Sequence, residues 1–325
     1  MQTCLHCSIV ACLSVLTLVP AQHSRASDIV LPPDTKFLFQ LDLKEFGKTS
    51  IGTKLIELTA REAAREMETE GEQLLEKVNE SLGFDPLQEI RTITLATSVL
   101  GNPERAFESG ALVVQLGKTT GNLEGLMLAL PGYDSKEHDD HTLHYVGEGS
   151  QTAVCSLFEE ASGNHTLVLA REESQVLRML ESLGSVGTAD SVALDDGVFA
   201  RVQLFEIPLE EIREEPAANV LKLVKQASLT IRETDAKLMR VDLNIEAVKE
   251  KKAEQIRQLL TGATAAIGLF LDNVDELKDP ELRKTAEDVL ESLKVEREDS
   301  NVHLQFSFPT KVMKEVLREQ ADLEL

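Results

Sequence analysis

The sequence predicts an α+β fold made of two tandem copies of one unit, with antiparallel sheets that are covered by helices. Three observations lead to this prediction. Short segments that alternate between apolar and polar residues recur along the chain, which is typical of half-buried strands. Amphipathic segments of helical period separate them. The order of these elements before residue 185 then recurs after residue 197, which favours an internal repeat.

The first copy is expected to follow the order strand, helix, hairpin, helix, strands, helix. It begins with a strand at 36–43 and a helix from about 52 to 82, whose apolar residues lie at helical spacing. Asp85 before Pro86 predicts an N-cap and a first helical residue. The remaining elements are a hairpin over 92–98 and 110–118, a short helix at 122–130, three strands at 142–148, 152–160 and 165–171, and a closing helix at 174–184.

The second copy is predicted from matched order and pattern. The segments 198–207, 228–234, 238–244 and 302–317 correspond in turn to 37–46, 92–98, 112–116 and 166–180. The middle helix of this copy is longer, and a further helix is predicted from Asp279–Pro280–Glu281 to about residue 293. The chain therefore divides into a signal peptide at 1–26, a first repeat at 27–184, a connector at 185–197 and a second repeat at 198–325.

The first 26 residues predict a cleaved secretory signal. A short apolar run ends in small residues, with Ser24 and Ala26 at the −3 and −1 positions of a cleavage site and a second possible cut after Ala21. We expect a periplasmic or secreted protein after cleavage near Ala26. Only Cys155 lies outside this segment, so the mature chain has no internal disulfide and depends on its core.

The charge of the chain restricts its partners. The formal net charge is −23, and removal of the signal with its one arginine leaves 32 Lys and Arg against 56 Asp and Glu, a net charge of −24. Such a surface disfavours nucleic acids and anionic lipids, and it favours basic proteins and divalent cations. No segment after the signal is long enough to span a bilayer. The most apolar one, 259–271, has 13 residues and predicts a buried helix.

Three histidines, at positions 138, 141 and 144, are the strongest candidate for a chemical site. On a helix, His138, His141 and His144 would share one face and could hold Zn²⁺ with one open position. Pro131 and Gly132 instead favour a solvated acidic loop, and the alternation that follows favours a strand, which would send His144 to the opposite face from His141. The loop is the preferred interpretation. A weak divalent-ion site and a catalytic zinc site remain open as alternatives.

A second candidate site is apolar. An apolar stripe runs along the predicted middle helix of the second copy, beside Gly262, Ala266 and Gly268, which would allow another element to approach closely. Tight packing on a sheet is the simpler interpretation. The floor of an apolar ligand groove is the alternative, and its candidate residues are Ile256, Leu260, Ala263, Ile267 and Phe270.

Sequence motifs for common enzymes and cofactors are missing. The mature chain has no nucleophile elbow, phosphate-binding loop, dinucleotide fingerprint, zinc-protease motif or C-x-x-C pair, and nothing in it indicates a cofactor. Trp is absent and Tyr occurs twice, which leaves little for an aromatic sugar platform. We therefore expect a protein that is not an enzyme.

Two stretches, at 31–55 and 83–97, resemble a broad group of uncharacterised exported bacterial proteins, notably from planctomycetes. The resemblance lies in a strand entry, an amphipathic helix and a turn into a second strand, and it is carried by Pro33, Asp34, Thr35, Gly83, Asp85, Pro86 and Ile90. It implies an extracytoplasmic α+β repeat protein and supplies no functional residues.

Together these features predict an exported, non-enzymatic binding or interaction module with an acidic surface. One alternative is a carrier of apolar ligands in a cavity between a helix and a sheet. A second alternative is a metal-dependent hydrolase at the three histidines.

Overall fold

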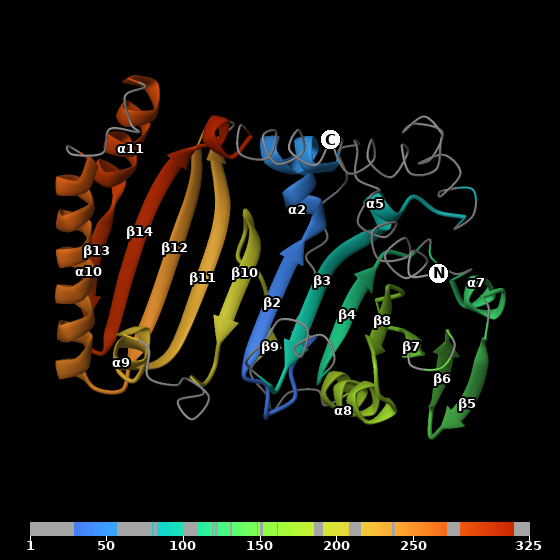
Figure 1. Cartoon of the computed structure of the whole chain (residues 1–325). Helices are drawn as coiled ribbons and strands as arrows, with labels where there is room; N and C mark the ends of the chain where they lie inside the picture. The colour runs from blue at the N-terminus through green and yellow to red at the C-terminus, as the bar shows by residue number, and fades with distance from the viewer. Residues whose placement is uncertain are drawn as a thin grey trace.

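The structure is a computed structural model dominated by one antiparallel sheet of 12 strands (Figure 1). Across the sheet the strands follow the order β13-β14-β12-β11-β10-β2-β3-β4-β8-β7-β6-β5. The structure describes residues 29–56, 80, 83–99, 109–118, 120, 123–130, 132–147, 149, 152–160, 162–184, 191–207, 216–235, 238–271 and 280–314.

The strands before residue 185 occupy one side of the sheet and those after residue 197 occupy the other. The first set is β2 (Phe37–Asp42), β3 (Ile90–Thr97), β4 (Gly110–Leu116), β5 (Asp134–His138), β6 (His141–Val146), β7 (Ala153–Glu159) and β8 (His165–Ala170). The second set is β10 (Val198–Leu204), β11 (Val224–Asp235), β12 (Leu238–Ala247), β13 (Lys294–Glu298) and β14 (Asn301–Pro309). A separate two-stranded sheet joins β1 (Ile29–Val30) and β9 (Ser191–Val192).

The prediction of two tandem units with their own sheets is wrong, because the strands form one continuous sheet that does not divide clearly into repeats. β2 and β10, each expected to begin a separate unit, pair with each other from Phe37–Leu204 to Leu41–Ala200. This pairing removes two open strand edges, whose backbone groups would otherwise need another partner. Side-chain alternation indicates which face of a strand is buried, but it does not specify which edges pair, so the sequence pattern could not distinguish one sheet from two.

One face of the sheet, called the α10 face, is covered by α10 (Glu250–Leu271) over β12, β13 and β14. Ile256 of α10 is buried there against a cluster that includes Ile245 and Val302. α11 (Pro280–Ser292) follows α10 and contacts β14, so that both helices stand at one end of the sheet (Figure 1). α2 (Leu43–Lys48) contacts β3 and β10 near the middle of the sheet.

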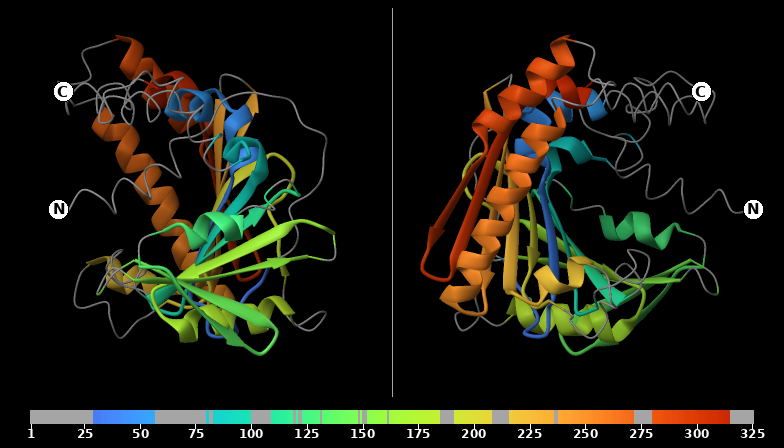
Figure 2. Two further views of the ribbon diagram at one scale, coloured as in Figure 1. Left: turned by 90° about the vertical axis from the view of Figure 1, so that its right-hand side faces the viewer. Right: turned by 60° about the vertical axis from the view of Figure 1, so that its left-hand side comes forward.

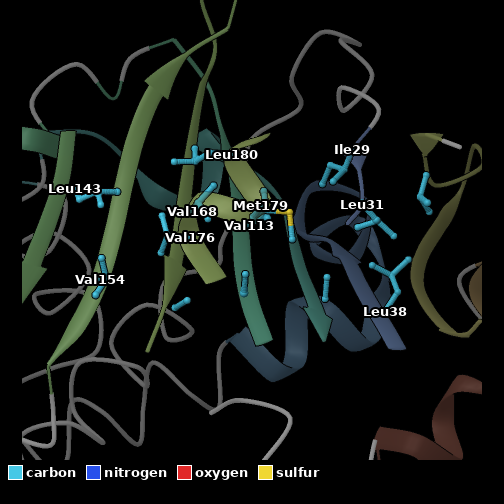
Figure 3. Packing of buried hydrophobic residues seen from close by; sticks show 14 residues of the cluster. Ile29, Leu31, Leu38, Val113, Leu143, Val154, Val168, Val176, Met179 and Leu180 are labelled. Carbon is cyan, nitrogen blue, oxygen red and sulfur yellow. The ribbon is translucent and has the colours of Figure 1, made fainter. Parts of the chain in front are cut away.

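The opposite face, called the α8 face, holds the largest core cluster beneath α8 (Glu173–Gly184). Val176 and Met179 of the helix join Val113 and Val168 of the strands in this cluster (Figure 3). The two-stranded sheet closes one side of the cluster with Ile29 and Val192, which are likewise buried. This core stabilises the region formed by β2 to β8.

The large sheet is strongly twisted. In Figure 2 the green strands β5 to β8 run across the direction of the orange and red strands β12 to β14. A right-handed twist between neighbouring strands accumulates over a sheet of this width, so a flat arrangement is not expected. The two ends of the sheet therefore present their faces in different directions.

Most of the predicted local elements are confirmed. The helix predicted over 122–130 is α7 (Leu123–Leu128), and the Asp85–Pro86 pair begins α5 (Pro86–Glu89), with the Glu89 N–H donating to the Asp85 carbonyl at 3.0 Å. The short helix α9 (Pro216–Leu221) lies where the repeat order places a helix after the strand at 198–207, whereas the edge strand β13 was not expected. The predicted helix at 52–82 lies mostly outside the described residues, as does the signal at 1–26. Among the helices that are described, none is both long and apolar enough to cross a membrane.

Candidate functional site

The histidine stretch forms a β-hairpin. The sequence predicts a loop for the first part of this stretch, but the structure has a strand there. β5 and β6 pair so that His138 lies opposite His141, joined through Asp139 and Asp140. Asp139 has a φ of 51°, in the left-handed region that aspartate tolerates better than most residues. β5 has no sequence pattern of a strand because it lies at the edge of the sheet with mostly exposed polar side chains.

The three imidazoles do not come together. His141 makes an edge-on contact with Phe158, with 6.3 Å between ring centroids. His144 lies three residues further along the strand and is 1% exposed on the opposite face, where its Nδ1 is 3.0 Å from the Tyr133 hydroxyl. Within the described ranges no group of three His, Cys, Asp or Glu side chains is placed to hold a metal ion.

Cys155 is part of the packing around His144. The two residues are Cα partners on β6 and β7, and Cys155 Sγ lies 3.4 Å from Met127 Sδ of α7. Burial raises the pKa of the Cys155 thiol to about 11, so the neutral thiol dominates near pH 7. A reactive cysteine needs the opposite shift. The contact between Cys155 and Met127 therefore joins α7 to the sheet, and Cys155 has no features of a nucleophilic centre.

The five residues of the predicted apolar groove separate along α10. Ile256 is buried in the core of the α10 face and Leu260 packs against that core. Ala263 and Ile267, one and two turns further on, are exposed, and Ile267 keeps 48% of its surface accessible. The side chain of Phe270 lies outside the described part of the structure. The structure thus brings the first two residues onto the sheet and leaves the next two facing outward.

A polar surface covers the α8 face of β10 to β14. Gln203 of β10 is the Cα partner of Leu38, a fully buried residue of the core beneath α8, whereas the partner of Arg201 is Gln40, a buried polar residue. The strand registers align the polar side chains in two rows. The first row is Arg201, Thr230, Asp242, Gln305 and Lys294, and the second is Gln203, Ser228, Asn244, His303 and Glu296.

These rows line a hollow of about 530 Å³, which we call the polar hollow. Its other lining residues are Asp195, Arg232, Arg240 and Leu304. It contains four side chains that are cationic at neutral pH, three Arg and one Lys, against three carboxylates, in a chain whose formal net charge is −23. The hollow is therefore a locally cationic site on an acidic protein, and its field favours anions at short range.

Two of the arginines are held by strong contacts. Arg240 donates from Nε to both carboxylate oxygens of Asp242 at 3.0 Å and from Nη2 to Gln305 Oε1 at 2.7 Å. Arg201 donates from Nη1 to the Ala193 carbonyl at 2.7 Å. Burial lowers the pKa of Arg201, but the guanidinium stays charged at neutral pH because the ordinary pKa of arginine lies far above 7.

Arg232 is held more weakly. Its Nη2 lies 3.5 Å from Asp242 Oδ2, and its buried Nε has no hydrogen-bond partner in the described structure. Asp242 is thus shared between Arg232 and Arg240, which are also direct Cα partners on β11 and β12. Like charges placed opposite each other on neighbouring strands repel, and a single carboxylate neutralises only one of them.

Sequence reasoning missed all of these residues, although their pattern is present in the sequence. Arg240, Asp242 and Asn244 alternate with the apolar residues that face α10, as do Ser228, Thr230 and Arg232 on the neighbouring strand. Such alternation normally indicates a solvated sheet face. Only the register, which the alternation does not encode, shows that these side chains gather into one hollow.

Comparison with known proteins supplies little further information. No protein-family model matches this sequence, and no curated protein matches it significantly. One solved structure, described as crystal form I of TP0453, aligns with 89% of this chain and 96% of that chain at 8% sequence identity and a TM-score of 0.40.

Proposed function

We propose that this chain is an exported, non-enzymatic binding module whose ligand occupies the polar hollow. The observation that carries this proposal is the change in the α8 face at β2. At Leu38 of β2 the face belongs to an apolar core beneath a helix, whereas from its partner Gln203 onward the same face carries polar side chains that line a hollow. Polar groups fixed on adjacent strands form a preorganised surface for hydrogen bonding.

The lining of the hollow favours a polar ligand. The amides of Gln203, Asn244 and Gln305 and the hydroxyls of Ser228 and Thr230 supply neutral donors and acceptors between the charged groups. An apolar ligand would leave these groups without partners, at a cost in free energy for each one. Basic proteins and divalent cations, which the net charge favours, remain predicted partners for the acidic surface elsewhere.

The test is native mass spectrometry of the protein purified from the cell envelope of its source under mild conditions. We expect the wild type to retain a polar molecule of defined mass, because binding groups on adjacent strands are already in place. Asn244→Leu should lose it, since leucine removes an amide from the second polar row and projects methyl groups into the hollow. Ser135→Leu is the matched control, because it makes a similar change at an exposed site on β5.

Circular dichroism should show that all three proteins are folded. Retention of one molecule by the wild type and the β5 variant, together with its loss from Asn244→Leu, would support binding in the hollow. Equal retention by all three proteins, or no retained molecule in any of them, would contradict the proposal.

A further inference from the structure

We infer that the polar hollow is an oxyanion site, in which the guanidinium groups of Arg232 and Arg240 bind the carboxylate or phosphate of a small polar molecule. This inference rests on the proposed function and specifies the chemistry of the ligand. It is carried by three features of the hollow: a pair of facing arginines that shares one carboxylate, an incompletely bonded guanidinium, and a lysine without an ion pair.

The arginine pair is the first feature. Arg232 and Arg240 are direct Cα partners on antiparallel strands, so both side chains project from the same face. Asp242 accepts two hydrogen bonds from Arg240 and lies at a longer distance of 3.5 Å from Arg232. One carboxylate therefore serves two fixed positive charges. A bound anion would supply the second negative charge that this pair lacks.

The bonding of Arg232 is the second feature. Its ion pair with Asp242 is longer than a good charge-assisted hydrogen bond, and its Nε has no partner among the described residues. About a third of the side chain remains exposed, so its terminal nitrogens can be reached by a ligand. A guanidinium presents its N–H groups in a planar fork that matches the two oxygens of a carboxylate or phosphate. Arg232 is consequently the group that gains most from an oxyanion.

The opposite end of the hollow supplies the third feature. Lys294 lines it from the edge strand β13 and makes no ion pair within the described ranges. At about 530 Å³ the hollow is larger than a bare phosphate needs. Gln305 lies between Lys294 and Arg240, and further amides and hydroxyls line the rest of the hollow. The ligand is therefore a small molecule that joins an oxyanion to further polar groups.

The overall charge limits the source of the oxyanion. A formal net charge of −23 repels an extended anionic polymer or an anionic membrane, whose charges remain outside the hollow and face the acidic surface. A small anion can instead enter the cationic hollow, where the nearest charges are those of the arginines. We therefore assign the oxyanion to a free small molecule rather than to a lipid headgroup.

The test is isothermal titration calorimetry with inorganic phosphate and with citrate, in chloride buffer at constant ionic strength. We expect at least one of these anions to bind the wild-type protein with a stoichiometry near one. Arg232→Gln should weaken binding by roughly ten- to a hundredfold, because it removes a charge-assisted hydrogen bond. The affinity of Arg232→Lys should lie between those of the wild type and Arg232→Gln, since lysine keeps the positive charge but lacks the planar fork of N–H groups. Arg283→Gln removes the same charge from the exposed face of α11 and should leave binding unchanged.

The melting temperature of each variant without anion shows whether it is folded. Arg240→Gln, which removes the other arginine of the pair, should also weaken binding and provides a second test if Arg232→Gln fails to fold. Equal affinity in the wild type and both arginine variants, or no binding of either anion by the wild type, would overturn the oxyanion assignment. Co-sedimentation with anionic phospholipid vesicles that depends on Arg232 would overturn the assignment to a small molecule.

These outcomes separate the inference from the function on which it rests. If a neutral molecule is retained in the hollow and lost in Asn244→Leu while phosphate and citrate do not bind, the binding module stands and the oxyanion assignment falls. If neither the retained molecule nor the anions respond to changes in the hollow, both fall.

Discussion

Tyr145 and Glu173 show how a single hydrogen bond can connect two elements of the first half of the chain. The Tyr145 hydroxyl donates to Glu173 Oε2 at 2.7 Å, and Lys136 Nζ donates to the other carboxylate oxygen at 2.8 Å. The contact joins β5 and β6 to the start of α8. The hydrogen bond to the carboxylate raises the pKa of Tyr145 to about 12, and the bonds from Lys136 and Tyr145 lower the pKa of Glu173.

The raised pKa of Tyr145 predicts a loss of stability at high pH. The folded state keeps the proton up to about pH 12, whereas the unfolded chain releases it near pH 10.0. The contribution of this hydrogen bond to folding stability is therefore complete below pH 10 and is lost as the pH rises through 12. Ultraviolet absorbance of tyrosinate measures the titration of the hydroxyl directly, because the chain has two Tyr and no Trp. We expect Tyr145→Phe to remove the titration near pH 12.

Glu173→Gln provides the control for this prediction. It keeps a hydrogen-bond acceptor for Tyr145 but removes the negative charge, so the titration of Tyr145 should move back toward pH 10. A titration near pH 12 that persists in Glu173→Gln would show that the carboxylate is not its cause.

Cys155 is predicted to be unreactive until the protein unfolds. It is buried, with Met127 Sδ against its sulfur, and its pKa of about 11 leaves little thiolate at neutral pH. In the chain from residue 27 onward it is the sole thiol. We expect an aromatic disulfide reagent to modify one thiol per chain in denaturant at pH 8 and almost none in the native state. Rapid labelling of the native protein would contradict this burial.

At the level of elements, α8 packs on the sheet through one apolar face. Val176, Met179 and Leu180 are buried against the sheet, whereas Glu181 is exposed. The helix is predictable from sequence because this spacing of apolar residues, ending at Gly184, is itself the signal of an amphipathic helix. Its packing partners come from strands that are distant in sequence, and the pattern of one helix does not identify them.

Truncation of Met179 is predicted to destabilise the fold. Met179 is 1% exposed, so Met179→Ala leaves a cavity in the largest core cluster and should cost about 2–5 kcal/mol in the free energy of unfolding. Glu181→Ala on the same helix should change stability by no more than about 0.5 kcal/mol. Urea denaturation followed by circular dichroism measures both. A similar loss in the two variants would show that the effect comes from the helix itself and not from its packing.

The elements that could be predicted are those whose burial leaves a periodic pattern. β2 and β14 alternate, and α11 begins at Pro280 as its capping residues indicate. β5 and β13 are polar edge strands that pair with a neighbouring strand on one side only, and their side chains carry no period that marks them as strands. The polar hollow depends on the register of five strands. Because side-chain periodicity does not encode register, the hollow could not be predicted either.

For the whole molecule, the pairing of β2 with β10 is the decisive feature. It converts two sets of strands into one sheet and places the polar hollow directly beside the apolar core. The described part of the connector, 191–197, also belongs to the packed structure, because Val192 lies in the core beneath α8 and β9 pairs with β1. The boundary predicted between two repeats therefore passes through a continuous hydrogen-bonded ladder.

This ladder predicts that fragments 27–197 and 198–325 depend on each other. Expressed separately, each would expose one long unpaired strand, so we expect aggregated or self-associated material. Mixed together during refolding, they should form a one-to-one complex that size-exclusion chromatography with light scattering can measure. Val202→Pro should prevent this association, because proline cannot donate a backbone hydrogen bond and distorts a central strand. If both fragments instead remained monomeric and unfolded cooperatively on their own, the β2–β10 pairing would not be what holds the two halves together.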